Sequence, residues 1–94
     1  MKRVIAKLKL GETALRVFKR YTQNLVEKSR AEDGNISYDL YQDVADKSVF
    51  LFIETYRNQE AVDLHFESEY LADFLARVNP LLREEPEVLI DTIY

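Results

Sequence analysis

The stretch that decides the fold of this chain is Phe50–Tyr70, which reads FLFIETYRNQEAVDLHFESEY. Successive side chains of a strand alternate between its two faces, so the first part predicts a strand that shares one face among Phe50, Phe52, Glu54 and Tyr56. A carboxylate at the end of this apolar row lies either at the margin of the sheet or enclosed inside the protein. If it is enclosed, desolvation raises its pKa and makes it a base or an acid near neutral pH. The residues alone leave both interpretations open.

A polar turn follows this strand, and residues 59–66 then predict a helix that carries the only histidine, His65. Asn58 is a residue type that caps helix N-termini, and Ser68 could cap a second helix in the same way. Because the turn is short, the helix must pack back on the sheet. If its histidine turns inward, the imidazole approaches the carboxylate of Glu54. The alternative is a structural role, in which His65 is a buried residue hydrogen-bonded to a backbone carbonyl or to Glu54.

Apolar residues recur with strand or helix spacing through the rest of the chain. Alternation predicts strands over residues 3–10, 35–42, 48–56 and 87–94, and spacings of three and four predict helices over about 13–31, 59–66 and 69–82. In the second strand we expect Ile36, Tyr38 and Leu40 to share one face. The order β-α-β-β-α-β is typical of the ferredoxin-like α+β fold, an antiparallel sheet with two helices on one face. We expect one domain over residues 1–94.

The third predicted strand has apolar side chains on both faces, unlike its neighbours. One face carries Phe50 and Phe52, and the other carries Val49, Leu51 and Ile53. Helices cover only one face of a ferredoxin-like sheet, and a bare apolar face of this size would promote aggregation. We therefore expect a homodimer in which the helix-free sheet faces of two copies pack together.

Composition excludes several classes of protein. The chain has 94 residues with six Tyr, five Phe, two Gly and two Pro, which suits a packed globule. The absence of cysteine excludes disulfides, thiol catalysis and cysteine-based zinc sites, and one histidine with scattered carboxylates gives no metal-ligand set. No apolar run approaches the roughly 20 residues of a membrane span, and Met1-Lys2-Arg3 leads into a strand instead of a signal-peptide core. We expect a cytoplasmic protein that does not bind membranes.

The net charge of −4 hides an asymmetry. Residues 1–30 hold nine Lys and Arg against two acidic residues, whereas residues 31–94 hold four against fifteen. The basic charges are spread along a strand and around a helix, without the Gly and aromatic interleaving of RNA-binding segments. We expect no nucleic-acid partner, and we interpret the two halves as neutralising each other within or between subunits.

Residues 29–40, SRAEDGNISYDL, resemble the signature of the antibiotic biosynthesis monooxygenase family. The similarity continues through Gln42-Asp43, Phe50, Glu54-Thr55-Tyr56, residues 61–65 and Ser68. The resemblance implies a dimeric α+β barrel built from two ferredoxin-like subunits. It also implies a substrate pocket in each subunit, between the sheet and the helices.

The chain departs from the family pattern at three points. Tyr56 stands where the family usually has Trp, and Ser68-Glu69-Tyr70 replaces the usual S-P-H, so the second histidine of the motif is absent. The chain also has no tryptophan, on which related haem-degrading members rely. The E-x-Tyr variant is similar to a branch that isomerises the phosphorylated autoinducer-2 signal.

The resemblance implies cofactor-independent oxidation of electron-rich phenols, quinols or anthrones, with no cofactor and no metal. Such chemistry needs an apolar pocket, a base and donors that stabilise an oxyanion. The candidate base is Glu54 or His65, and the candidate donors are Tyr56, Tyr38 and Tyr70. Candidate wall residues are Phe52, Phe74, Tyr21 and Leu25. Tyr38 and Tyr21 also lie on predicted core faces, where they could simply pack.

Three functions remain open at this point. The first, which we favour, is a monooxygenase acting on a small hydroxylated aromatic. The second is an isomerase acting on a small polar ligand that is phosphorylated in the similar branch. The third is a non-catalytic dimeric binding module. Phe-rich walls would favour an aromatic ligand, inward Lys or Arg would favour a phosphate, and a pocket filled by its own side chains would favour the third.

Overall fold

The computed structural model describes all 94 residues and contains every expected element. The strands are β1 (Lys2–Lys9), β2 (Asn35–Gln42), β3 (Val49–Tyr56) and β4 (Glu87–Thr92). The helices are α1 (Leu15–Arg30), α2 (Gln59–Phe66) and α3 (Glu69–Val78), and a 3₁₀ turn, η1 (Asn79–Leu81), follows α3. The sheet has the order β2-β3-β1-β4, and all neighbouring strands are antiparallel. This is the α+β ferredoxin-like arrangement that the sequence predicts.

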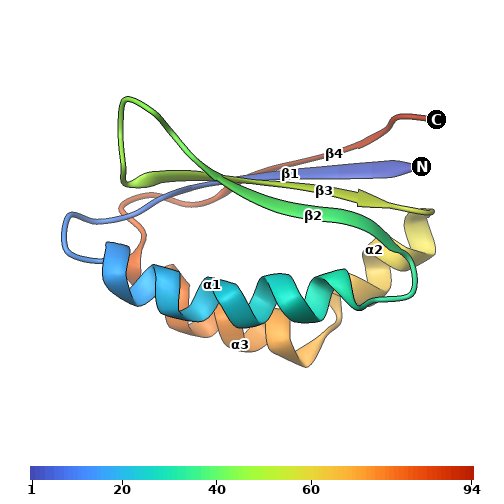
Figure 1. Ribbon diagram of the computed structural model, residues 1–94, viewed down its shortest axis with the longest axis horizontal. Helices are drawn as coiled ribbons and strands as arrows, with labels where there is room; N and C mark the ends of the chain where they lie inside the picture. The colour runs from blue at the N-terminus through green and yellow to red at the C-terminus, as the bar shows by residue number, and fades with distance from the viewer.

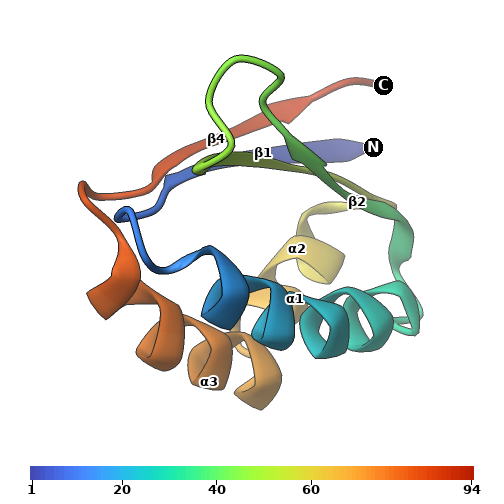
Figure 2. The same cartoon turned by 60° about the vertical axis from the view of Figure 1, so that its left-hand side comes forward.

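The molecule has two layers. The four strands form one layer, and α1 and α3 lie side by side beneath one face of the sheet (Figures 1 and 2). The short α2 joins β3 to α3 at the end of the sheet where the chain also begins and ends (Figure 1). The other sheet face carries no helix. None of the helices combines the length and apolar character that a membrane crossing needs.

Aromatic side chains connect the sheet to the helices. Phe18 of α1 lies between Phe50 of β3 and Phe74 of α3, with ring centroids 4.6 Å and 6.1 Å apart. Phe52 contacts the same Phe74 edge-on at 6.1 Å. A fully buried Phe contributes roughly 1.5–3 kcal/mol to folding, so this cluster anchors both long helices on β3.

The ends of α2 are held by two hydrogen bonds. The Oδ1 of Asn58 accepts from the backbone N–H of Ala61 at 2.9 Å, as the N-cap prediction requires. Ser68 occupies the N-cap position of α3, but its side chain makes no capping bond there. Its Oγ instead donates to the carbonyl of His65 at 2.6 Å, so the expected capping bond is wrong and the hydroxyl secures the end of the histidine-bearing helix.

Two strand expectations are corrected. The register shifts between Asn35 and Ser37, and this bulge turns Ile36 out to 54% exposure instead of onto the face of the buried Tyr38. A bulge inserts one unpaired residue, so the alternation breaks at that point. The closing strand β4 ends at Thr92, and as the sheet edge it leaves its apolar residues exposed, namely Val88, Leu89 and Ile90.

The helix-free face carries the apolar residues that prompt the dimer prediction. Val49, Leu51 and Ile53 are each half-buried there, and Ile53 pairs with Ile5 of β1. Leu89 of β4 pairs with the same Ile5 and is 57% exposed. Packing of two copies through this face stays a prediction.

Candidate active site

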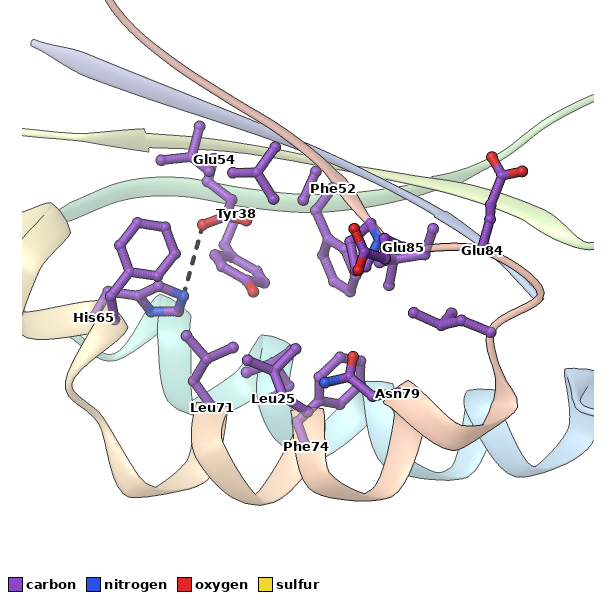
Figure 3. Close-up of a pocket in the computed structure, with 18 of the residues that line it drawn as sticks. Leu25, Tyr38, Phe52, Glu54, His65, Leu71, Phe74, Asn79, Glu84 and Glu85 are labelled. Atoms are coloured by element: carbon purple, nitrogen blue, oxygen red, sulfur yellow. Dashed lines mark ion pairs between the residues drawn. The ribbon is translucent and has the colours of Figure 1, made fainter.

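A cavity of about 710 Å³ lies between the sheet and the helices. Twelve of its 19 lining residues are hydrophobic. The walls come from β1, β3, α1 and α3, including Val4, Ala6, Leu8, Phe52, Leu25, Leu71, Phe74 and Leu75. One end holds Glu54, His65 and Tyr38, and the other end holds Asn79, Glu84 and Glu85 (Figure 3). Its volume lies in the usual range of small-molecule sites.

Glu54 lies inside the protein, because its side chain projects from the helix-covered face of β3. It is 3% exposed, and its cross-strand neighbours are Val4 and Tyr38. Burial is the main cause that raises the pKa of the Glu54 carboxyl to about 7. A hydrogen bond from Tyr56 lowers this pKa, and the negative charge of Glu32 raises it. The hydroxyl of Tyr56 donates to Glu54 Oε1 at 2.6 Å. Glu54 is therefore partly ionised near neutral pH and can exchange a proton there.

His65 faces the sheet, because the buried side of α2 consists of Ala61, Val62 and His65. Its side chain is 1% exposed. Nε2 lies 3.7 Å from Glu54 Oε1 (Figure 3, dashed line), an ion-pair distance that is too long for a direct hydrogen bond. The structure thus brings together the two candidate bases that the sequence predicts.

Glu32 contacts His65 at the ring nitrogen that does not face Glu54. It lies in the turn after α1, and its Oε2 is 2.7 Å from His65 Nδ1. The hydroxyl of Tyr70 donates to the same oxygen. Burial, followed by the hydrogen bond to the Glu32 carboxylate, raises the pKa of Tyr70 to about 12. Glu32, His65 and Glu54 therefore form a continuous row of titratable groups.

The three candidate donor tyrosines divide into one cavity residue and two others. Tyr38 lines the cavity, with its ring 5.4 Å from that of His65, and burial raises its pKa, so it stays a neutral donor. Tyr56 is fully buried beside Glu54 and does not line the cavity, and burial raises its pKa as well. Tyr70 bonds to Glu32 outside the cavity lining.

Of the four candidate wall residues, the structure places three in the cavity wall and one outside it. Leu25, Phe52 and Phe74 line the cavity. Tyr21 is half-buried against the core but does not line the cavity, and the guanidinium of Arg77 lies 5.2 Å from its ring centroid. Positions 21 and 25 lie one turn apart on the same side of α1, but the ring of Tyr21 contacts Arg77 of α3 instead of lining the cavity.

The mouth of the cavity is formed by residues that sequence reasoning missed. Asn79, Arg83, Glu84 and Glu85 line it (Figure 3 labels all but Arg83). Arg83 is held by Asp46 at 3.1 Å and by the Ser48 hydroxyl at 3.1 Å. This connection between α3 and β4 has no periodic pattern, so the sequence gives no signal for it.

Comparison with known proteins identifies the group to which this arrangement belongs. The family model for antibiotic biosynthesis monooxygenases matches residues 1–77, which include the strand with Glu54 and the helix with His65. The chain belongs to the antibiotic biosynthesis monooxygenase family. The match ends before Asn79, so the family model does not cover the mouth of the cavity.

The chain is also similar in sequence to individual proteins. The chain is 39% identical over 69 residues to the uncharacterized protein sll1783 of Synechocystis, covering 73% of this chain and 47% of that protein. It is 34% identical over 67 residues to "Putative monooxygenase YcnE" of Bacillus subtilis, covering 71% and 70%. The chain therefore spans about half the length of the first relative and over two thirds of the second.

A crystal structure of an antibiotic biosynthesis monooxygenase has the same fold. It superimposes with a TM-score of 0.95 at 29% identity and covers 100% of this chain and 99% of the other. The superposition confirms the ferredoxin-like class for a member of this family.

The chemistry that this site offers is proton transfer at the polar end of an apolar cavity. The structure contains no cluster of three or more His, Asp or Glu side chains arranged to bind a metal ion. Its titratable groups instead form a row, in which the two ring nitrogens of His65 face different carboxylates. Glu32 is the member that sequence reasoning missed, because its contact with His65 spans 33 positions of the chain.

Proposed function

We propose that this protein is a cofactor-independent monooxygenase that oxidises a small hydroxylated aromatic, of quinol or anthrone type, with O2. The observation that carries the proposal is a buried carboxylate, Glu54, which titrates near neutral pH and faces an apolar cavity beside His65. Family membership and the monooxygenase name of one relative support the same reaction class. The substrate class rests on the apolar lining of the cavity and on what the family resemblance implies.

The cavity wall supports an aromatic substrate. Three phenylalanines line it, Phe52, Phe66 and Phe74, together with the ring of Tyr38. Flat apolar rings pack well against such walls in offset or edge-on geometry. The single lining cation, Arg83, is engaged with Asp46 and Ser48 at the mouth. This lining gives less support to the isomerase alternative, because a phosphorylated ligand would need free cations.

The volume of the cavity also bears on the third alternative. A non-catalytic module that had lost its site would fill the pocket with its own side chains. Here about 710 Å³ remains open beside Glu54 and His65. A cavity of this size costs packing energy, which favours a bound ligand as the reason for its retention.

In the proposed reaction the substrate supplies all four electrons. Glu54 or His65 removes a proton from the hydroxyl or the activated C–H of the substrate, and the resulting anion transfers electrons to O2. A C–O bond forms, the O–O bond breaks, and the second oxygen leaves as water with the two protons that the substrate has lost. The sum for an anthrone is CH2 + O2 → C=O + H2O, so neither flavin nor metal is required.

Tyr38 and the apolar walls have separate roles in this scheme. The Tyr38 hydroxyl, kept neutral by its raised pKa, can donate to the developing oxyanion. The apolar walls exclude water, which strengthens that hydrogen bond and protects the anion from simple reprotonation.

The test is oxygen consumption with a panel of substituted hydroquinones and anthrones. We expect the wild type to exceed the uncatalysed autoxidation rate, and Glu54→Gln and His65→Ala each to reduce turnover by roughly a hundredfold or more. Glu12→Gln is the matched control, because Glu12 is an exposed carboxylate outside the cavity. If wild type, variants and control all equal the autoxidation rate, the monooxygenase proposal fails.

A further inference from the structure

Glu32 is a titratable group that the proposed reaction does not use. Its Oε2 contacts His65 Nδ1 at 2.7 Å and accepts from the Tyr70 hydroxyl, whereas its Oε1 is buried without a partner. A carboxylate that only stabilised the fold would be expected to satisfy both oxygens. One of the two bonded partners of Glu32, His65, lines the cavity.

We infer that Glu32 is a positioning residue that holds His65 as the Nδ1–H tautomer and so keeps Nε2 free to accept a proton at the cavity. A carboxylate has only acceptor oxygens, so the proton in the 2.7 Å contact belongs to His65 Nδ1. In the neutral imidazole the other nitrogen then carries the lone pair. That nitrogen, Nε2, lies 3.7 Å from Glu54 Oε1.

Without this contact the opposite tautomer would be favoured. An unconstrained imidazole prefers to carry its proton on Nε2, and Glu54 would accept that proton in a hydrogen bond. Nε2 would then be blocked as a base. The contact with Glu32 thus favours the tautomer in which the imidazole proton is on Nδ1 and points to Glu32, not on Nε2 toward Glu54.

The surroundings of His65 contain no competing cation in contact with the ring. The ionisable groups that face it are Glu32 from the turn after α1, Tyr38 from β2, Glu54 and Tyr56 from β3, and Tyr70 from α3. Lys28 lies over the ring of Tyr70, 6.0 Å from its centroid. When Nε2 takes a proton, the imidazolium is therefore placed between two carboxylates.

This placement suits the proton balance of the proposed reaction, on which the kinetic part of the inference rests. The proton that leaves the substrate is held at Nε2 while O2 reacts, and it is returned to the peroxide oxygen that leaves as water. The Nδ1 proton stays in its bond to Glu32 throughout. No proton has to enter or leave the protein.

The tautomer can be measured directly, because His65 is the only histidine of the chain. In protein labelled with ¹⁵N-histidine, two-bond ¹H–¹⁵N correlation at a pH where the ring is neutral should show the Nδ1–H form in the wild type. Glu32→Ala should shift the signals toward the Nε2–H form, and Glu32→Gln, which retains an acceptor, should keep the wild-type pattern. A wild-type Nε2–H pattern, or an unchanged pattern in Glu32→Ala, would overturn the inference.

Kinetics separate this inference from the proposed function. With a quinol that the wild type oxidises, Glu32→Ala should lower kcat about a hundredfold with little change in KM, and Glu32→Gln should recover at least tenfold of that loss. Asp33→Asn is the control, since its carboxylate is fully exposed and adjacent in sequence. If no quinol is turned over, the proposed function fails while the tautomer measurement still decides the role of Glu32. A kcat in Glu32→Ala equal to that of Asp33→Asn would overturn the role in turnover.

Discussion

Replacing Glu54 with Gln should stabilise the fold above neutral pH while it removes the candidate base. Glu54 is 3% exposed, and burial is the main cause that raises its pKa from 4.5 to about 7. Below pH 4.5 the carboxyl is protonated in both the folded and the unfolded chain, so burial has no charge cost. Between pH 4.5 and 7 the unfolded chain loses its proton first, and stability falls as the pH rises. Above pH 7 the full cost is present.

The magnitude follows from the two pKa values. A difference of 2.5 units between 4.5 and 7 corresponds to about 3 kcal/mol. With these two pKa values, the linkage relation gives a loss of folding free energy of about 1 kcal/mol at pH 5 and about 3 kcal/mol at pH 8. The amide of Glu54→Gln has no such cost, and its oxygen can still accept from Tyr56. We therefore expect the difference in free energy of unfolding between the variant and the wild type to grow by about 2–3 kcal/mol from pH 5 to pH 8.

Urea unfolding at equal protein concentration, followed by circular dichroism at several pH values, measures this difference. Comparing the two proteins across pH removes the constant effect of exchanging one side chain for another. Glu12→Gln, which removes an exposed carboxylate, should show no comparable gain. If the advantage of Glu54→Gln does not grow with pH, the carboxylate is not held at a cost, and the argument that burial prepares it as a base is refuted.

Three further outcomes are expected. Wild-type kcat/KM should rise about tenfold per pH unit up to about pH 7, the pKa of Glu54. Tyr56→Phe should move that midpoint to higher pH, because it removes a hydrogen bond that lowers the pKa of Glu54 in the wild type. Oxygen consumption measured across pH checks both outcomes. We propose that the helix-free sheet faces pack in a homodimer, so sedimentation should give twice the chain mass, and Leu51→Lys should yield monomers or unfolded chain because it buries an unpaired charge. Gly34→Ala should lower the free energy of unfolding by about 1–3 kcal/mol in urea titrations, because the new Cβ would lie 2.3 Å from the Cβ of Ala61.

Local patterns predict the elements of the fold, and they predict that the two candidate bases meet if Glu54 is enclosed and His65 turns inward. The alternation of β3 places Glu54 in the same row as Phe50 and Phe52, and all three are buried. The short turn after β3 requires α2 to fold back, and this brings His65 within 3.7 Å of Glu54. Both inferences use neighbours that are close in sequence, where strand and helix geometry leave few alternatives.

Features that depend on distant contacts or irregular backbone could not be predicted. Nothing near Glu32 in the sequence indicates a partner 33 positions away, nor that Tyr70 would bond to it instead of lining the cavity. The bulge that exposes Ile36 has no glycine to mark it and interrupts an otherwise regular alternation. The mouth of the cavity, with Arg83, belongs to a connection without a repeating pattern.

The presence of two candidate bases has a physical explanation once substrate binding is considered. An aromatic ligand that fills the cavity displaces water from Glu54, and this further disfavours the carboxylate, so the pKa of Glu54 rises above its value of about 7 in the empty cavity. A single buried carboxylate would then hold the proton too firmly to return it quickly to the peroxide. His65 gains a positive charge when it accepts a proton, and the carboxylate of Glu32 lies 2.7 Å from its Nδ1. Desolvation strengthens that attraction, so the step that weakens Glu54 as an ionised base favours His65 as the site where the proton is held.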